Sequence, residues 1–204
     1  MPTPTSTRRT PGRRETDARA TRDAIVTAAL ELFTERGYAE VGTEEIVARA
    51  QVTRGALYHH FKDKQDLFRA VHERVEDGLM ERIGARMEGA DDPWDLMVTG
   101  MRAFLDACEE PAVKQVAMTD APAVLGWREW RDIDEKHGLG LTRAALQGAV
   151  DAGVLRPIAV EPMAHLLVAS LSEAAFVIAH SDHPRTERRR VERALVELLE
   201  GLRA

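Results

Sequence analysis

The sequence predicts an all-α protein of about nine helices, and three observations support this fold class. Ala, Leu, Arg and Glu are abundant among the 204 residues and aromatic residues make up only 5%, which favours helix over strand. Apolar residues recur at spacings of three and four along most of the chain, as they do on one face of an α-helix. No segment shows the sustained alternation of apolar and polar residues that is typical of a half-buried strand.

The N-terminal segment, residues 1–15, is rich in Pro, Thr and Arg and has no apolar periodicity, which indicates a disordered basic arm. Both an inert tail and an arm that orders on phosphates or in a minor groove fit this composition. The first helix is expected over residues 16–36, and Gly37 can end it in a left-handed conformation. The apolar positions of this helix are Ile25, Ala28, Ala29, Leu32 and Phe33.

Two short helices follow, and each is expected to begin at an N-cap. Thr43 is the cap predicted for the first and Thr53, ten residues later, for the second. A fourth helix is predicted from the cap Asp63 to about Met87. Two short helices joined by a tight turn are the outline of a helix-turn-helix.

The rest of the chain predicts five further helices, separated by Gly- and Pro-containing breaks. They are expected at residues 97–108, 112–126, 126–152, 160–181 and 186–203. The domain organisation that follows is an arm over 1–15, an N-terminal three-helix helix-turn-helix domain over 16–75, and a larger helical domain over 76–204.

Charge is distributed unevenly along the chain, whose net charge is −6. Residues 1–74 contain 13 Lys and Arg against 11 Asp and Glu, whereas the remainder contains 15 against 23. Six arginines lie within residues 1–22. A basic end on an acidic body suits a protein that contacts phosphate at one end only.

Several protein classes are disfavoured. The single cysteine, Cys108, allows no intrachain disulfide, which favours a reducing compartment. The sequence shows no signal peptide and no apolar run near ~20 residues, so a cytoplasmic protein without a membrane partner is expected. The motifs G-x-S-x-G, H-E-x-x-H, the P-loop and the Rossmann glycine pattern are absent, so neither an enzyme nor a cofactor is predicted. Ser181, Asp182 and His183 contain triad residue types, but neighbours in sequence are badly placed to act together.

The 41 residues from Ala28 to Phe68 include ALELFTERGYAEVGTEEIVARAQVTRGALYHHFKDKQDLF and resemble the TetR/AcrR family of transcription regulators. The resemblance implies a DNA-binding domain followed by a divergent helical domain with a small-molecule cavity and a dimer interface. One position departs from the family pattern, because Gln51 stands where a glycine is usual in the turn. That turn often requires a positive φ, which costs a non-glycine residue on the order of 1 kcal/mol.

The first turn of the second short helix holds the residues most suited to DNA recognition. Thr53, Arg54 and Gly55 lie where a recognition helix presents side chains to base edges. Arg54 is predicted to contact a guanine edge, and Gly55 lets the backbone approach the DNA closely. A solvated surface arginine at Arg54 and a core tyrosine at Tyr58 are the alternatives.

Phosphate contacts are expected around this helix. The resemblance implies that Tyr58, His60 and Lys64 bind phosphate and that His59 reaches a base or the backbone. Thr43 can offer its hydroxyl and its backbone N–H to another phosphate. The pair His59 and His60 is not expected to bind metal, because neighbouring helical side chains diverge by about 100° and no further ligands have suitable spacing.

The larger domain is expected to hold the effector. Its large, adaptable apolar residues fit a plain core, and they also fit a pocket for an apolar or aromatic molecule. The candidate ligand-binding residues are Met97, Met101, Phe104, Cys108, Met118, Trp127 and Trp130. Arg128, Asp132 and His137 are candidates for orienting a polar group of the ligand.

The last two predicted helices carry wide apolar stripes that two subunits could pack into a four-helix interface. The candidate dimer residues are Leu167, Leu171, Ala174, Ile178, Val191, Leu195 and Leu198. A monomer could instead bury both stripes internally. The sequence thus predicts a homodimeric regulator, commonly a repressor, that a small effector releases from a palindromic double-stranded operator. The alternative is a helical protein-interaction module without specific DNA binding.

Overall fold

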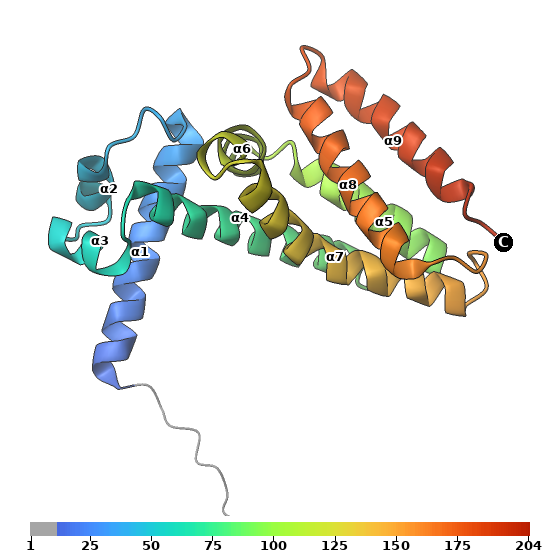
Figure 1. Cartoon of the computed structure of the whole chain (residues 1–204), viewed down its shortest axis with the longest axis horizontal. Helices are drawn as coiled ribbons and strands as arrows, with labels where there is room; N and C mark the ends of the chain where they lie inside the picture. The colour runs from blue at the N-terminus through green and yellow to red at the C-terminus, as the bar shows by residue number, and fades with distance from the viewer. Residues whose placement is uncertain (1–11) are drawn as a thin grey trace, which may run out of the picture.

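The computed structural model describes residues 12–204, and within this range the chain forms helices joined by loops, with one isolated β-bridge between Leu155 and Arg203 (Figure 1). The all-α prediction is therefore confirmed. The elements are α1 (Arg13–Arg36), α2 (Thr43–Arg49), α3 (Arg54–His60), α4 (Lys64–Met87), α5 (Pro93–Ala107), the π-helix η1 (Val113–Asp120), α6 (Ala121–Val124), α7 (Trp127–Asp151), α8 (Val160–Ala179) and α9 (Pro184–Glu200). Most of the predicted arm lies outside the described residues.

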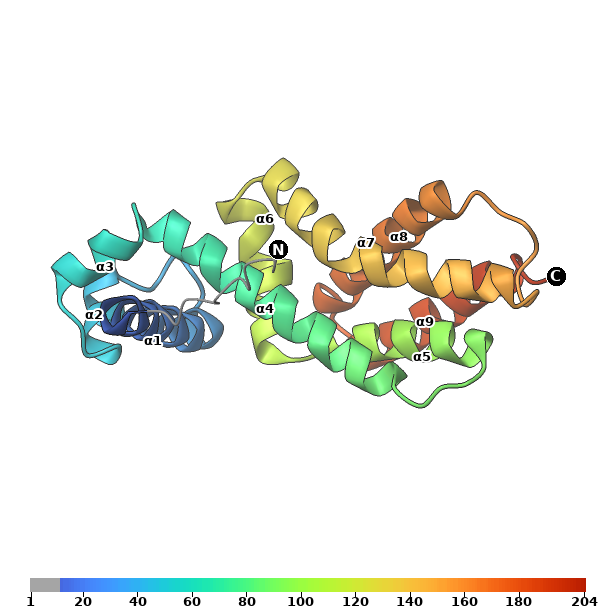
Figure 2. The same ribbon diagram turned by 90° about the horizontal axis from the view of Figure 1, so that it is seen from below.

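The molecule has a small end and a large end that the long helix α4 connects (Figures 1 and 2). Helices α1, α2 and α3 gather around the N-terminal part of α4 at the small end. Helices α5, α7, α8 and α9 form the large end, where they pack against each other and against the C-terminal part of α4. A single helix therefore spans from the helix-turn-helix to the larger domain.

Both ends of α1 differ in detail from the sequence prediction. The helix begins at Arg13, three residues earlier than expected, because the Glu15 carboxylate accepts a hydrogen bond from the Gly12 N–H over 3.2 Å and caps the first turn. Gly37 ends the helix with a φ of 80° and a ψ of 161°. The φ is positive, but the ψ is extended and not the left-handed helical value that we predicted.

The short helix predicted over residues 112–126 is a π-helix followed by one α-helical turn. In a π-helix each N–H donates to the carbonyl five residues earlier, and the Ala121 N–H accordingly donates to the Val116 carbonyl. Pro122 has no N–H to give the Ala117 carbonyl. The Trp130 indole N–H donates to that carbonyl instead, over 3.1 Å, so a buried aromatic residue of α7 completes the hydrogen bonding of η1.

Helix α8 has the length and apolar composition that a membrane span requires, which the sequence analysis did not anticipate. It is nevertheless part of the core, because Ala164, Val168, Ala175 and Ile178 are buried and the helix packs against α5, α7 and α9. Core helices commonly share these properties with membrane spans.

Gln51 lies in the turn between α2 and α3 with a φ of +55°, the one positive value at a non-glycine position in residues 12–204. Its N–H donates to the Ala48 carbonyl over 3.2 Å, and the Val52 N–H donates to the Val47 carbonyl over 3.1 Å. These are the two hydrogen bonds of a Schellman C-cap. The positive φ expected at this turn is confirmed, and the chain adopts it without glycine.

Gln51→Gly is expected to raise the free energy of unfolding by about 0.5–1 kcal/mol. The left-handed conformation costs a residue with a Cβ about 1–2 kcal/mol, and the greater freedom of glycine in the unfolded chain offsets part of this gain. Denaturant unfolding of the two proteins measures the difference. Gln51→Ala keeps the Cβ and serves as the control; if it stabilises the protein as much as Gln51→Gly does, backbone strain is not the cause.

Candidate DNA-binding site and cavity

The helix-turn-helix is held by local capping. The Thr53 hydroxyl accepts a hydrogen bond from the Ala56 N–H over 3.1 Å and begins α3, as predicted. Asp63 caps α4 in the same way through the Asp66 N–H, over 2.8 Å. At α2 the prediction is off by one residue: Gly42 is the N-cap and Thr43 is the first helical residue, because the Glu45 carboxylate bonds the Gly42 N–H over 3.1 Å.

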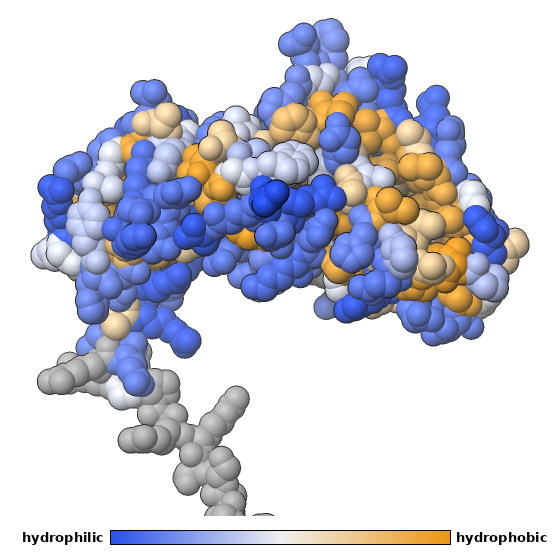
Figure 3. Space-filling view, viewed as in Figure 1, coloured by the Kyte–Doolittle hydropathy of each residue, from blue (hydrophilic) through white to orange (hydrophobic). Residues whose placement is uncertain are grey.

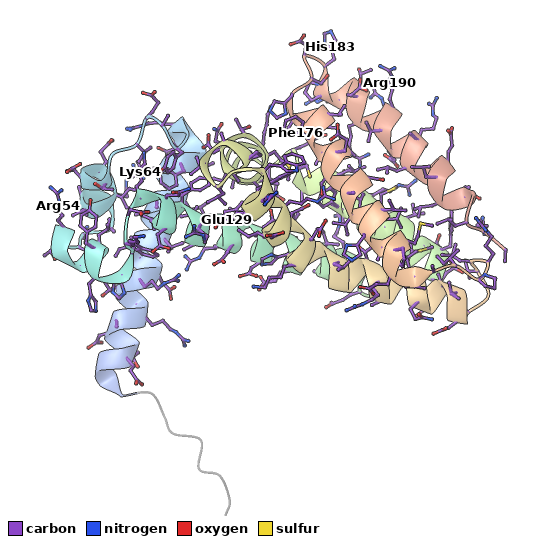
Figure 4. The ribbon with its side chains drawn as sticks, viewed as in Figure 1. Arg54, Lys64, Glu129, Phe176, His183 and Arg190 are labelled. Atoms are coloured by element: carbon purple, nitrogen blue, oxygen red, sulfur yellow. The ribbon has the colours of Figure 1, made fainter. Side chains whose placement is uncertain are left out.

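The outer face of α3 exposes Arg54 and Tyr58, and Figure 4 shows Arg54 at the tip of the small end. The Arg54 side chain is 69% exposed and Tyr58 is 43% exposed, with the guanidinium carbon 5.6 Å from the centre of the tyrosine ring. A core tyrosine is thereby excluded at this position. Glu44 lies 3.4 Å from the guanidinium and is 72% exposed, so solvent screens this ion pair and holds the guanidinium only weakly.

Gly55 follows Arg54 in the first turn of α3 and is also exposed. A Cβ at Gly55 would meet only the Thr53 hydroxyl, at 3.9 Å. The packing inside the protein therefore does not require glycine here. The missing side chain instead leaves the surface of α3 open for the close approach of another molecule.

The C-terminal end of α3 brings two histidines next to a residue of α1. The rings of His59 and His60 are 5.2 Å apart, and His59 is exposed whereas His60 is half-buried. Burial, together with electrostatic interaction with His59 and Arg22, lowers the pKa of His60. Arg22 is exposed, with its guanidinium carbon 5.1 Å from the centre of the Phe61 ring. The sequence analysis did not select Arg22, although it lies within the arginine-rich segment.

Lys64 turns inward. Its ammonium group donates to the Tyr38 carbonyl and lies 4.0 Å from the centre of the Tyr38 ring. Burial lowers the pKa of Lys64, while the carboxylates of Asp120 and Glu45 oppose this shift. Figure 4 shows Lys64 set back from Arg54, so the phosphate contact that the resemblance implies requires this side chain to leave its position against Tyr38.

Three side-chain contacts join the two ends of the molecule beside α4. Asp120 accepts from the Tyr38 N–H over 2.8 Å, and the Gln65 amide donates to the Val124 carbonyl over 2.6 Å. Arg69 of α4 forms an ion pair with Glu129 of α7. The loop after α1 is thus tied to η1, and the N-terminal turns of α4 are tied to α6 and α7.

An apolar cavity of about 100 Å³ lies in the large end, between α4, α5, α7, α8 and α9. Its lining is formed by Met80, Ile83, Met87, Met97, Gly100, Met101, Phe104, Asp134, Gly138, Leu141, Thr142, Ala145, Leu146, Leu167, Val168, Leu171, Ser172, Leu195 and Leu199. Four methionines give it adaptable walls. The sequence analysis did not select the three α4 residues, although they continue the apolar stripe of that helix.

The predicted ligand residues divide into three groups. Met97, Met101 and Phe104 line the cavity. Cys108, Met118 and Trp130 are buried in the core but do not line it. Trp127 is 58% exposed and packs against Trp130, with the ring centres 4.8 Å apart.

The polar groups suggested for orienting the ligand also lie outside the cavity lining. Arg128 and Asp132 are exposed, and His137 lies 3.2 Å from Asp77.

Burial raises the pKa of the Cys108 thiol, so it stays protonated at neutral pH, as an ordinary buried cysteine does.

Most of the predicted dimer residues are used within the chain. Leu167, Leu171 and Leu195 line the cavity, and Ala174 and Ile178 are buried. Val191 is half-buried.

The outward apolar positions on α8 and α9 are Leu166, Val177 and Leu198, which are 62%, 38% and 57% exposed. Of these, only Leu198 was among the predicted dimer residues. Figure 3 shows the larger apolar patches on the large end of the molecule, whereas the small end is mainly hydrophilic.

A capped two-helix unit that presents an exposed arginine and tyrosine on its second helix defines a DNA-binding protein of the helix-turn-helix class. Residues 25–71 match the model of the bacterial regulatory proteins of the tetR family, and residues 94–202 match the tetracyclin repressor-like C-terminal domain. The second match alone covers more than half of the chain. The protein therefore belongs to the TetR family and is a transcriptional regulator with a DNA-binding domain.

Known proteins resemble this chain over most of its length. A TetR-family transcriptional regulator from Pectobacterium atrosepticum is 33% identical, with a TM-score of 0.84 over 95% of this chain and 98% of that one. The TetC protein of transposon Tn10 from Escherichia coli is 25% identical over 149 residues, which are 73% of this chain and 75% of that protein. RolR, in complex with resorcinol, is 19% identical with a TM-score of 0.72 over 91% and 90% of the two chains, so it shares the fold.

Proposed function

We propose that this protein is a homodimeric repressor that leaves a palindromic operator when a small apolar or aromatic molecule enters the cavity. The observation that carries the proposal is the course of α4, which follows α3 directly and contributes Met80, Ile83 and Met87 to the cavity wall. A single helix thus joins the segment that carries the recognition helix to the wall of the effector cavity. Because its target is genomic DNA, we place the protein in the cytoplasm.

On the operator, Arg54 reads a base edge in the major groove while the groups around it bind the backbone. Thr53 caps α3, Tyr58 and His59 are exposed on it, and Gly55 allows its close approach. Thr43 and His60 supply phosphate contacts at either side of α3. We add Arg22 to this set because it is exposed beside the C-terminal end of α3.

Release follows a shift between two arrangements of α4. A ligand that separates the walls of the cavity favours the arrangement in which α4 is displaced and moves α3 with it. The two recognition helices of the dimer then no longer have the spacing that fits the operator. The ties from Tyr38, Gln65 and Arg69 to η1, α6 and α7 couple this movement to the large end. The resorcinol bound by RolR, which shares this fold, supports an effector with a single aromatic ring.

The dimer forms through the outward faces of α8 and α9, where Leu166, Val177 and Leu198 are exposed. Introducing a charge there, as in Leu166→Glu with Leu198→Glu, is expected to convert the dimer to a monomer, because a carboxylate cannot be buried unpaired in an apolar interface. Light scattering after size exclusion measures the mass. Ala85→Glu, on an exposed site of α4, is the control; a dimer that survives the paired substitution places the interface elsewhere.

The experiment that tests the function is a titration of the purified protein against a fluorescent duplex from upstream of its own gene, by anisotropy at two salt concentrations. Tight binding that depends on sequence and weakens with salt supports the regulator. A selection from random duplexes locates an operator that lies elsewhere. If that selection returns no consensus, the protein-interaction module becomes the better interpretation.

A further inference from the structure

Four buried polar side chains gather at one end of the cavity and come from three helices. His72 and Glu76 belong to α4, Asp134 to α7 and Ser172 to α8, and their exposed fractions are 0%, 1%, 6% and 3%. His72 Nε2 lies 3.5 Å from Glu76 Oε1, and the Ser172 hydroxyl donates to Asp134 Oδ2 over 2.5 Å. Asp134 and Ser172 line the cavity itself.

This cluster lowers the stability of the fold, because several of its buried polar atoms make no hydrogen bond within residues 12–204. Three buried atoms of this cluster have no hydrogen-bond partner among the described residues. They are the two ring nitrogens of His72 and the Oε1 atom of Glu76. Burying such groups without partners costs about 1–3 kcal/mol each, and apolar side chains of similar size would avoid the cost. Polar groups retained in this way are a feature of functional sites.

The lining of the cavity restricts the charge of its ligand. Within the part of the chain that the structure describes, Asp134 is the one titratable side chain in that lining, and the other polar side chains are Thr142 and Ser172. Among residues 12–204, no lysine, arginine or histidine lines the cavity. A carboxylate or phosphate ligand would therefore meet no positive partner, whereas a cationic nitrogen would meet the carboxyl group of Asp134.

We propose that the effector is an apolar molecule with a single cationic nitrogen, which Asp134 holds at the polar end of the cavity. This assignment rests on the proposed effector-controlled function and names the chemical class of the effector. The methionines and Phe104 enclose the apolar body of the ligand, since thioether and aromatic side chains are favourable neighbours for both apolar groups and organic cations. Glu76 and His72 are the members of the cluster that do not line the cavity, and they are neutral polar groups.

The protonation states of the cluster leave Asp134 as its single charged group, which suits a ligand with a single positive charge. Burial raises the pKa of Glu76 to about 8 and lowers the pKa of His72 to about 4, so both are neutral at pH 7. Burial also raises the pKa of Asp134, while the hydrogen bond from Ser172 opposes this shift. On α7, Glu135 adds to the shift and Arg131 and His137 oppose it. A cation within about 4–6 Å favours the ionised carboxylate, so the ligand itself stabilises the charge that it needs.

The test uses three probes with the same aromatic ring: phenethylamine, phenethyl alcohol and phenylacetate, which carry a positive, a neutral and a negative end. Binding is followed by NMR of protein labelled with ¹³C at the methionine methyl groups. Met80, Met87, Met97 and Met101 line the cavity, while Met118 and Met163 do not and act as internal controls. The signals therefore report where each probe binds as well as its affinity.

We expect phenethylamine to shift the four cavity methyl signals and to bind at least about tenfold more tightly than phenethyl alcohol, with phenylacetate the weakest. Asp134→Asn should reduce the affinity for the amine to that for the alcohol and leave the alcohol unchanged. Asp132→Asn removes an exposed carboxylate from the same helix and should change neither affinity.

Equal affinities for the amine and the alcohol in the wild type would overturn the assignment, as would tighter binding of phenylacetate, unshifted cavity signals with the amine, or a preference for the amine that persists in Asp134→Asn. The comparison of probes in the wild type stands even if the variant does not fold. Operator binding without ligand is measured separately. If it is present while the amine preference is absent, the effector class is wrong and the regulator assignment stands.

Discussion

Arg54→Ala is expected to weaken operator binding by at least about 30-fold while leaving the fold and the dimer intact. A bidentate contact between arginine and a guanine is worth about 1–3 kcal/mol, and a dimer loses one contact in each half-site. The side chain is 69% exposed, and its neighbours Glu44 and Tyr58 are themselves exposed, so its removal leaves neither of them as a buried group without a partner. Anisotropy titrations with operator and with random duplex measure the affinity and the specificity.

The matched control is Arg143→Ala, which removes the same charge from an exposed position on α7, where Arg143 pairs with Glu161. It should change operator affinity little. Equal losses in the two variants, or an equal loss on random duplex for Arg54→Ala, would show that Arg54 acts only through its charge. Glu44→Gln extends the test: it frees the Arg54 guanidinium before binding and should raise operator affinity modestly.

The second large effect is on the free energy of unfolding at about pH 8, which Glu76→Gln is expected to raise by several kcal/mol relative to its value at low pH, compared with the wild type. Burial raises the folded-state pKa of Glu76 from 4.5 to about 8. The unfolded chain therefore releases this proton near pH 4.5 while the folded protein keeps it, and the stability falls as the pH rises from there towards 8. Each pKa unit corresponds to roughly 1.4 kcal/mol. A glutamine, which is always neutral, removes this loss.

His72 acts in the opposite direction. Burial lowers its folded-state pKa from 6.5 to about 4, so the stability that it contributes is present above pH 6.5 and is lost as the pH falls towards 4. Denaturant unfolding of wild type and Glu76→Gln at several values between about pH 5 and pH 8 separates the two groups. Glu81→Gln, an exposed change on the same helix, is the control. Parallel pH profiles for wild type and Glu76→Gln would mean that Glu76 ionises normally in the folded protein.

The helix-turn-helix could be predicted from sequence because its determinants are local. Thr53 and Asp63 cap helices through N–H groups three residues away, and the turn at Gln51 is closed by hydrogen bonds that span a few residues. The resemblance to the TetR family covers the same segment, so local capping and family pattern agree. The errors there are small shifts, such as the cap at Gly42 in place of Thr43.

The larger domain was predictable as helices but not as a site. Helical periodicity placed α8 and α9 within a few residues, yet it could not decide which side of each apolar stripe faces inward. Leu166 and Leu167 are neighbours that point about 100° apart, and packing alone turns Leu167 to the cavity and Leu166 to solvent. The same limitation affects Trp127 and Trp130, of which one is exposed and the other buried.

Sequence by itself determined the all-α class, the position of the recognition helix and its exposed Arg54, because capping, periodicity and motif act over a few residues. Only the tertiary structure decided the π-helical turn at η1, the wall that α4 gives to the cavity, and the cluster of His72, Glu76, Asp134 and Ser172. The members of that cluster lie on three helices up to a hundred residues apart in the chain. No local pattern marks them, since their proximity and their shifted pKa values arise only when those helices pack and exclude water.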